Sequence, residues 1–523
     1  MSATPERPGA VKSLGQAMRS WRTASVTLLS FASGMPLGLV WIAIPDWMRS
    51  VGVDIKVVGL FSLTQAPWTF KFLWSPLMDR YSPRFFGRRR GWMAIAQVVL
   101  CLLGLVLAGV GDHPETPWVV AALALAIAFA AASYDIAFDA YAVDVLRPEE
   151  QGVAVGARTA VYRAAMFTAG GLAITLAAKM GWGWVNAMLG LAYLPFLLVT
   201  WKAPEPEERL AAPRTLREAV WLPFLGFLGR HRALEILGFV VFYKFADNLA
   251  QALLRPFLID LGYSAMDRGV ALTTIATFAT LAGAMLGGML TNVMGLGPSL
   301  WIFGLLQIVS NIGYVFLVDA GINRPLMYGA MGFESFTQGL GTGAFSVLLM
   351  RLTQKRFSAT QYALFSSLFG IGRILSGPAS GVLVDALGWK TFFYLSMALG
   401  IPGLVLLGRF VPWGVKEPYF AVEPRGERRP LSAAAITARG LLGALVGLAC
   451  VAFVQASLAA LKAMRGSDRG TFDLGASLSA LAHPSGAGDW LTLLGLVVAA
   501  AAVGLMTAAV AAARHGERVT ESA

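Results

Sequence analysis

Apolar runs of about 20 residues recur along the whole chain, and each is long enough to cross a hydrocarbon core of about 30 Å as one helix. Composition supports this pattern. Of the 523 residues, 56% are hydrophobic and 14% are charged, whereas soluble proteins have roughly 45–50% apolar and 25% charged residues. We therefore expect an all-α integral membrane protein, with no segment left over for a large soluble domain.

Hydropathy predicts fourteen transmembrane helices. Their expected ranges are 24–45, 56–77, 92–110, 117–145, 155–179, 183–201, 234–260, 268–292, 298–319, 325–351, 360–386, 389–411, 434–461 and 490–513. An even number places both ends of the chain on one side. The loops that hold most basic residues follow every second helix, as in 79–92 and 351–356. By the positive-inside rule, both termini are expected to be cytoplasmic.

The net charge of +12 would suggest a polyanion partner in a soluble protein. Here the basic residues lie in short loops, so membrane topology explains them better, and we expect the lipid bilayer but no nucleic acid as a partner. The basic N-terminal residues precede an apolar stretch without a cleavage pattern, which indicates a retained first helix. Cys101 and Cys450 lie in apolar runs, which argues against a disulfide framework or a metal cluster.

A weak internal repeat relates two sets of six helices. A shift of 210 positions superposes five identical residues. The pairs are Gly52 and Gly262, Gly59 and Gly269, Gln151 and Gln361, Arg163 and Arg373, and Gly171 and Gly381. With a three-residue slip, "GW" at 181–182 also meets "GW" at 388–389.

This repeat predicts the major facilitator architecture, in which two halves rock around a site near the membrane midplane. The expected domains are an N-terminal half (1–201), a cytoplasmic linker (202–233), a C-terminal half (234–411), and a segment with two extra helices (412–523). The second part of the linker is amphipathic and is expected at the cytoplasmic surface. We expect the protein to act as a monomer.

Three carboxylates lie at the end of the fourth helix, in "SYDIAFDAYAVDVL". Charged residues inside the membrane are costly and by default mark function. Asp135 and Asp139 share one helical face, and Asp144 points about 140° away from Asp139. Asp135 and Asp139 are our candidates for proton coupling. Arg163 is expected at the same depth, where it would pair with them or bind a substrate carboxylate.

A packing pair without a transport role is the alternative reading of these charges. Lys71, near the end of the second helix, is another candidate for substrate binding, although a lysine there can also extend to the interface. Four aromatic residues, Trp68, Trp74, Tyr134 and Tyr162, are candidates for stacking on sugar rings, and packing is the alternative for each.

A gate is expected at the cytoplasmic mouth. Asp79 and the run Arg88, Arg89 and Arg90 lie in the loop after the second helix, and Asp144 is level with that loop. We expect Asp144 to pair with these arginines. A pure topology signal is an equally good explanation of the arginines.

The second set of helices has polar residues of its own. The substrate-binding candidates there are Lys244, Asp247, Glu334, Gln338, Gln361 and Arg373. Lys244 and Asp247 are three apart on one helix and are expected to pair. Arg255, Gln307 and Asn311 add polarity, although the ninth helix is peripheral in this architecture.

Seven stretches of the chain resemble the AmpG muropeptide permeases. They are "SFASGMPLGL" (30–39), "FKFLWSPLMDRY" (70–81), "FFGRRRGW" (85–92), "DIAFDAYAVDVL" (135–146), "APEPE" (203–207), "FSATQYALFSSL" (357–368) and "GWKTFFYLS" (388–396). The resemblance covers roughly residues 24–411, and such permeases commonly have two extra C-terminal helices.

The resemblance implies proton-driven import of N-acetylglucosaminyl-1,6-anhydro-N-acetylmuramyl peptides across the bacterial inner membrane, without a cofactor. These are cell-wall fragments recovered for peptidoglycan recycling, and in some bacteria their level governs β-lactamase induction and hence antibiotic resistance. The three aspartates match the family's motif in the fourth helix, and Asp79 with Arg88 to Arg90 match its loop.

Other functions remain open at this point. An importer of the same fold for a siderophore, an acyl-CoA or another amphiphilic anion is the main alternative. An enzyme is disfavoured, because the sequence has no nucleophile elbow, nucleotide loop or metal-ligand spacing. A membrane sensor is disfavoured because no soluble output domain is expected.

Overall fold

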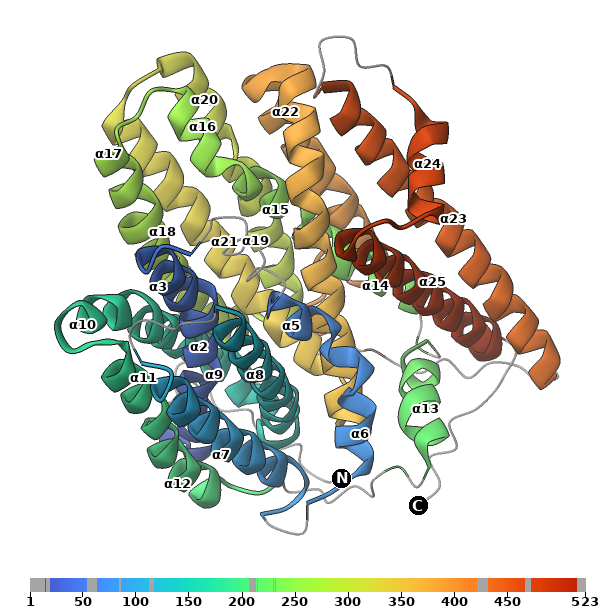
Figure 1. The fold of residues 1–523 in the computed structure, drawn as a ribbon. Helices are drawn as coiled ribbons and strands as arrows, with labels where there is room; N and C mark the ends of the chain where they lie inside the picture. Colours follow the sequence, from blue (N-terminus) through green and yellow to red (C-terminus); the bar gives the residue numbers. More distant parts are fainter. Residues whose placement is uncertain are drawn as a thin grey trace. The chain divides into compact units, whose positions relative to one another are not determined.

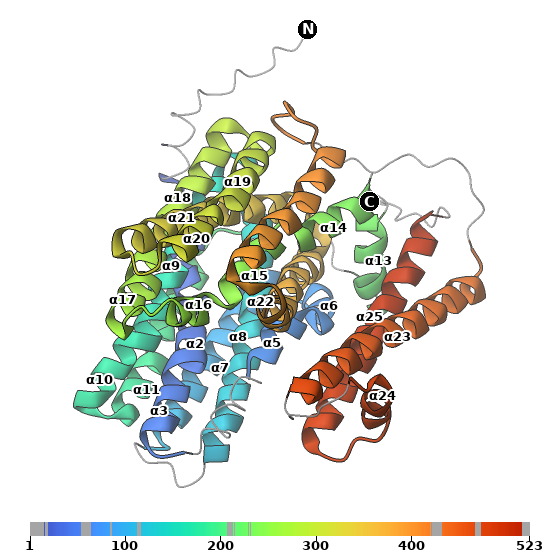
Figure 2. The same cartoon turned by 90° about the horizontal axis from the view of Figure 1, so that it is seen from above.

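The computed structural model of the protein describes residues 15, 19–53, 64–83, 86–111, 117–206, 213, 215–228, 230, 232–418, 420, 431–465 and 472–514. The fold is all-α, as the sequence predicts, and Figures 1 and 2 show it from two sides. Two compact units are distinguished, one of residues 1–219 with 234–419 and one of 220–233 with 420–523. Both expected halves fall in the first unit.

The first half is built mainly of long helices. Its α-helices are α2 (Trp21–Gly38), α3 (Ile44–Ser50), α5 (Ala66–Phe70), α6 (Ser75–Arg80), α7 (Arg88–Ala108), α8 (Pro117–Val145), α9 (Pro148–Phe167), α10 (Ala173–Met180), α11 (Trp182–Leu191) and α12 (Tyr193–Lys202). The π-helical turns η1 (Leu39–Ala43) and η4 (Thr168–Leu172) join α2 to α3 and α9 to α10.

The second half follows α13 (Leu216–Leu228). Its α-helices are α14 (Ala233–Phe242), α15 (Phe245–Ala252), α16 (Leu254–Asp260), α17 (Ala265–Gly269), α18 (Ala276–Met294), α19 (Leu296–Ser310), α20 (Ile312–Ala320), α21 (Arg324–Leu352) and α22 (Ser358–Phe410). A non-helical Gly388 divides α22 into two helices, at the boundary that the sequence predicts between its eleventh and twelfth spans.

Ten helices of the described part are long and apolar enough to span a membrane. They correspond to ten of the fourteen expected spans, and the total of fourteen stays a prediction. Each of the other four, the second, seventh, tenth and eleventh, is a helix with internal polar residues or a broken helix. The expected second span also includes 56–63, which lies outside the described residues. Spans that carry polar side chains score poorly on hydropathy.

Prolines explain two of the breaks. Pro256 has no N–H for the carbonyl of Ala252, where α15 ends and α16 follows. Pro76 likewise cannot bond the carbonyl of Phe72, and the chain there forms the 3₁₀ turn η3 (Lys71–Leu73) between α5 and α6. Both breaks lie next to charged residues, since Lys71 lies in the turn η3 and Arg255 lies at the start of α16.

The second unit contains α23 (Ala433–Arg465), α24 (Leu474–Ala482) and α25 (Ala487–Arg514). Small residues let α23 and α25 approach closely, because a Cβ on Gly443 would meet Thr507 and a Cβ on Gly447 would meet Val503. The two long helices match the expected extra spans.

The backbone carries the same repeat that the sequence suggests. Gly52 and Gly262 have φ of 86° and 84°, and Gly111 and Gly321, also 210 positions apart, have φ of 77° and 61°. The two "GW" turns begin at residues with φ of 84° (Gly181) and 75° (Gly388). These left-handed turns are accessible to glycine without strain, so the repeat is kept where helices of each half must end or turn.

A glycine contact joins the halves near the junction of α8 and α9, which we name the α8–α9 end. A Cβ on Gly288 of α18 would lie 2.1 Å from the carbonyl oxygen of Gly152 on α9. Asn292 of α18 accepts a hydrogen bond from the Gly152 amide at 3.1 Å and donates to the Glu149 carbonyl at 2.6 Å. The two halves are therefore closed against each other at this end.

Gly288→Ala is expected to force α9 and α18 apart, because overpacking a tight contact costs about 1–3 kcal/mol. Pulsed electron paramagnetic resonance (double electron–electron resonance) between spin labels at the exposed positions Glu149 and Lys416 should show a longer distance in the variant than in the wild type. Gly269→Ala is the control, since a Cβ there meets nothing within 4 Å. An unchanged distance in Gly288→Ala would contradict a closed contact.

Candidate functional site

Asp135 of α8 is buried and bound by neutral donors. The Ser33 hydroxyl on α2 donates to its Oδ1 at 2.5 Å, and the Trp68 indole N–H on α5 donates to its Oδ2 at 3.0 Å. Ala130 to Ala132, about one turn before Asp135 on α8, are small buried residues. Only 7% of Asp135 is exposed.

Asp139 lies one turn further along α8 and is held by two cations. Nη2 of Arg158 on α9 is 2.6 Å from Oδ1, and Nζ of Lys71 is 3.3 Å from Oδ2. The Arg158 guanidinium also lies 4.9 Å from the centre of the Phe138 ring, which is close enough for a cation–π contact. The ion pairs compensate for the burial of three charges.

Arg158 occupies the place that the sequence assigns to Arg163. The reason is the start of the helix: α9 begins at Pro148, whereas the expected span begins at 155. By the helical rise, Arg158 lies roughly 15 Å and Arg163 roughly 22 Å from that start. Asp139 and Asp135 lie roughly 9 and 15 Å from the end of α8, so Arg158 lies closer to their level than Arg163 does. Arg163 is exposed, so the expected pairing with the aspartates is wrong. The sequence position of Lys71 predicts a place near the membrane interface, whereas in the structure its side chain is buried in the ion pair with Asp139.

Of the aromatic candidates, Trp68 contacts Asp135, whereas Tyr134 is packed inside the first half. Trp68 lies against Asp135 and makes an edge contact with Trp41, with ring centroids 5.7 Å apart. Tyr134 is fully buried, donates to the Leu29 carbonyl at 2.9 Å and stacks on Phe138. Its geometry is that of a packing residue.

The remaining aromatic candidates lie elsewhere. Trp74 stacks on Phe129 and donates to Ser133. Tyr162 is partly exposed on α9.

A buried clamp joins the halves at the α8–α9 end. Arg89 donates to Asp79 at 2.6 Å, to Asp144 at 3.0 Å and to the Ser358 hydroxyl at 2.7 Å. Asp79 also accepts from the backbone N–H and the hydroxyl of Thr360, at 2.8 and 2.6 Å. We name these five residues the clamp. Ser358 and Thr360 open α22 in the second half, so the clamp crosses between halves.

The other two arginines of the run differ in role. Arg88 lies 4.0 Å from Asp144 and donates to the Lys355 carbonyl of the second half at 3.5 Å. Arg90 instead binds the end of the first half and the start of the linker, through the carbonyls of Trp201 and Ala203 and the carboxylate of Glu205. The structure thus brings Asp144 together with Arg88 and Arg89, as expected, and places Arg90 apart.

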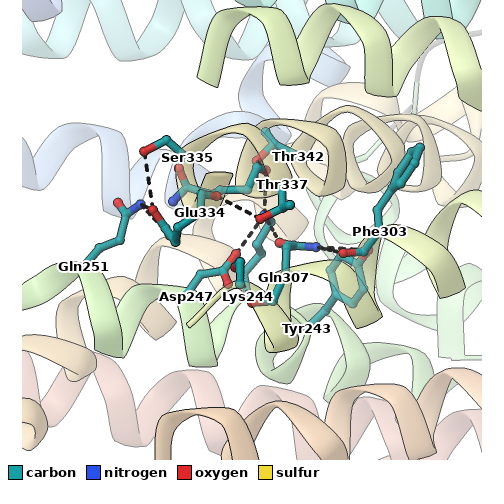
Figure 3. Close-up of polar contacts among 12 residues, drawn as sticks. Tyr243, Lys244, Asp247, Gln251, Phe303, Gln307, Glu334, Ser335, Thr337 and Thr342 are labelled. Atoms are coloured by element: carbon teal, nitrogen blue, oxygen red, sulfur yellow. Dashed lines mark hydrogen bonds and ion pairs between the residues drawn. The ribbon is translucent and has the colours of Figure 1, made fainter. Parts of the chain in front are cut away.

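The second half holds a separate buried cluster, drawn in Figure 3. Lys244 lies 3.2 Å from Asp247, as expected, donates to the Gln338 carbonyl at 3.0 Å, and also donates to Gln307. Gln307 belongs to α19, the ninth helix, so that helix is not purely peripheral. Glu334 of α21 accepts from Gln251 at 3.0 and 3.3 Å and from Tyr314 at 3.2 Å.

Two further candidates lie away from this cluster or outside the described side chains. Gln361 binds the backbone and side chain of Gln354 at the start of α22. The side chain of Arg373 lies outside the described residues. Arg255 is exposed.

Sequence reasoning missed several residues of these clusters. They are Arg158, Ser33, Ser358, Thr360, Gln251 and Tyr314. Arg158 had a usable signal, because Pro148-Glu149-Glu150 is a helix start with acidic residues in its first turn. The others are ordinary polar residues that gain a role only through tertiary contact.

Comparison with known proteins decides the family. The model of the Major Facilitator Superfamily matches residues 26–364. The anhydromuropeptide permease of Escherichia coli (strain K12) is 43% identical over 388 residues, which cover 74% of this chain and 79% of that protein. The chain belongs to the anhydromuropeptide permease (AmpG) family of the Major Facilitator Superfamily. An uncharacterized protein of Haemophilus influenzae is 33% identical, over 72% of this chain and 91% of its own length.

Solved structures share the fold of this AmpG family member. A bacterial homologue of the iron transporter ferroportin, in an outward-facing state, has a TM-score of 0.58 at 15% identity and covers 74% of this chain and 98% of that chain. The proton:xylose symporter XylE has a TM-score of 0.56 at 14% identity, over 76% of this chain and 97% of its own. At this identity the likeness extends to the fold alone.

Arg158→Gln should lower the free energy of unfolding by about 3–5 kcal/mol, because it breaks a buried ion pair and leaves Lys71 as the one remaining cation bound to Asp139. Arg163→Gln, on the exposed side of the same helix in this AmpG family member, should change it by less than about 0.5 kcal/mol. Unfolding in detergent, titrated with sodium dodecyl sulfate, measures both. Equal losses in the two variants would contradict the assignment of the ion pair to Arg158.

Proposed function

We propose that this protein imports anhydro-muropeptides across the bacterial inner membrane and that the proton gradient drives the import. The proposed cargo is supported by the 43% identity to an anhydromuropeptide permease over 74% of this chain. The transport mode rests on the buried charges of α8 and α9 inside a transporter fold. The protein is then a transporter without a cofactor, acting as a monomer.

The Asp139 site has the chemistry that such a cargo needs. A muropeptide joins two amino sugars to a short peptide with free carboxylates. In the present conformation Lys71 and Arg158 are engaged by Asp139. When Asp139 takes up a proton, the two cations are released and can bind a peptide carboxylate, with Arg158 suited to a two-pronged contact.

Aromatic residues beside this site suit the sugar part of the cargo. Trp68 and Trp41 are both only partly buried and lie next to Asp135. The flat face of an indole ring packs against the apolar C–H face of a pyranose ring. Carboxylate-binding cations and stacking aromatics in one place favour a glycopeptide over a purely apolar cargo.

The clamp acts as the gate in this proposal. The α8–α9 end holds Arg88, Arg89, Arg147 and Lys355, and by the positive-inside rule these residues support a cytoplasmic location of this end. With an even number of spans, both termini would be cytoplasmic as well. Closure at that end by the clamp and by the Gly152–Gly288 contact corresponds to a conformation that is closed toward the cytoplasm. The linker and the two extra helices do not enter this account.

A siderophore, an acyl-CoA or another amphiphilic anion is the alternative cargo. The same two cations would bind such an anion. The level of identity to a permease named for anhydro-muropeptides favours the first cargo. Direct competition decides between them: excess unlabelled anhydro-muropeptide, and not excess siderophore or acyl-CoA, should block uptake of labelled anhydro-muropeptide.

Labelled anhydro-muropeptide should accumulate in right-side-out vesicles only while a pH gradient is imposed. Asp139→Asn should abolish this accumulation but spare exchange without a gradient, because the amide mimics a carboxyl that never releases its proton. Asp319→Asn, at an exposed ion pair with Lys390, is the control. Wild-type accumulation that does not depend on the gradient would refute the proposal, and accumulation by Asp139→Asn would remove this residue from proton transfer.

Asp79→Asn should weaken closure toward the cytoplasm. A hydrogen bond to a charged group is worth about 1.5–3 kcal/mol, so the closed fraction relative to the open one should fall about ten- to a hundredfold. The distance between spin labels at Glu149 and Lys416 measures the shift. An unchanged distance distribution would show that the clamp does not control the gate.

A further inference from the structure

The buried charges of the first half are balanced. The carboxylates Asp135 and Asp139 lie within electrostatic range of the cations Lys71 and Arg158, and Asp139 contacts both cations. With both carboxylates ionised, two negative charges face two positive charges. This group needs no proton to be neutral in the present conformation.

The cluster of the second half is not balanced. Lys244 and Asp247 neutralise each other at 3.2 Å. Glu334 is the additional carboxylate, and it is only 1% exposed. It accepts hydrogen bonds from the amide of Gln251 and the hydroxyls of Tyr314 and Ser335, all of them neutral. Among the described side chains, no cation bonds to Glu334.

An ionised Glu334 would therefore leave a net negative charge in a site away from water, which is costly in a membrane. One proton on Glu334 makes the cluster neutral. We propose that Glu334 binds a proton in this conformation and is a proton-binding residue of the transport cycle, separate from the Asp139 site. This inference rests on the proposed proton-driven import.

The local chemistry accommodates a protonated Glu334. Figure 3 shows Gln251 approaching the Glu334 carboxyl from α15. The two ends of a glutamine amide are interchangeable by a half turn, so Gln251 can present its oxygen to accept a hydrogen bond from the carboxyl O–H. Oε2 of Glu334 is occupied by Gln251, Tyr314 and Ser335. That leaves little room for an ammonium group of the cargo, and a proton is the smaller occupant.

The charged groups around Glu334 are few. Lys244 and Asp247 lie within electrostatic range of it, from the start of α15, and Tyr314 faces it from α20. Arg255 of α16 is exposed, and the side chain of Arg373 on α22 is outside the described residues. In the cycle, the proton reaches Glu334 from water on the outer side and leaves it to water on the cytoplasmic side after the halves have rocked, with no bond made or broken besides the O–H bond.

Infrared difference spectroscopy of the purified protein tests the inference without transport. Raising the pH should remove a protonated-carboxyl C=O band in the wild type and in Asp135→Asn and Asp139→Asn. That band should be absent from Glu334→Gln. If the band persists in Glu334→Gln, or disappears instead in one of the aspartate variants, the proton is not on Glu334 and the inference is overturned.

Transport of labelled anhydro-muropeptide into proteoliposomes gives the second readout. Glu334→Gln should lower the gradient-driven accumulation ratio below that of the wild type, because coupling through Asp139 alone remains, while gradient-free counterflow continues. The amide is neutral, has the size of the carboxyl and, like the protonated carboxyl, has one carbonyl acceptor and an adjacent donor. Asp319→Asn should behave as wild type. An ion-pair role for Glu334 predicts instead that accumulation and counterflow fail together at every pH, and such a result overturns the inference.

The two proposals fail in distinguishable ways. If the wild type shows no gradient-driven accumulation, the proposed function fails, whatever the variants do. If the wild type accumulates cargo and Glu334→Gln accumulates it equally well, proton-driven import stands and only the role of Glu334 is lost.

Discussion

The pairing of Asp139 with Lys71 and Arg158 is the interaction on which the first half depends. Each of these charges is too costly to bury alone, so α8, α9 and the turn between α5 and α6 are held where the three meet. A proton on Asp139 removes the one group that both cations need. The same contact that orders these helices is therefore the one that a proton can release, and in the proposed cycle this release couples the gradient to cargo binding.

The clamp applies the same physics at the junction of the halves. Arg89 and Asp79 are nearly without solvent exposure, and their remaining hydrogen bonds are satisfied by Asp144 within the first half and by Ser358 and Thr360 of the second. In the proposed cycle the bonds to Ser358 and Thr360 break when the halves separate, so the clamp contributes to the barrier to opening. The Gly152–Gly288 contact adds a steric condition, since only residues without a Cβ let α9 and α18 approach this closely.

The sequence predicted the fold class, and it located α8 at 117–145, because twenty or more apolar residues leave a helix as the only way to satisfy the backbone in lipid. The sequence predicted less well where the helices break and which polar side chains face each other. The breaks before α6 and α16 come from Pro76 and Pro256, which hydropathy does not weigh. The ion pair was assigned to Arg163 because the start of α9 was set seven residues too late, and two helical turns decide which arginine faces an aspartate.

Other parts of the site could not be read from one sequence. Ser33, Ser358 and Gln251 look like ordinary polar residues until tertiary packing brings them to Asp135, Arg89 and Glu334.

In the proposed transport cycle, cargo binding and proton binding at Asp139 are one event. Proton uptake on binding of anhydro-muropeptide to the purified protein in weakly buffered solution tests it most directly. The account predicts uptake that depends on Asp139, and cargo binding without any proton uptake would contradict it.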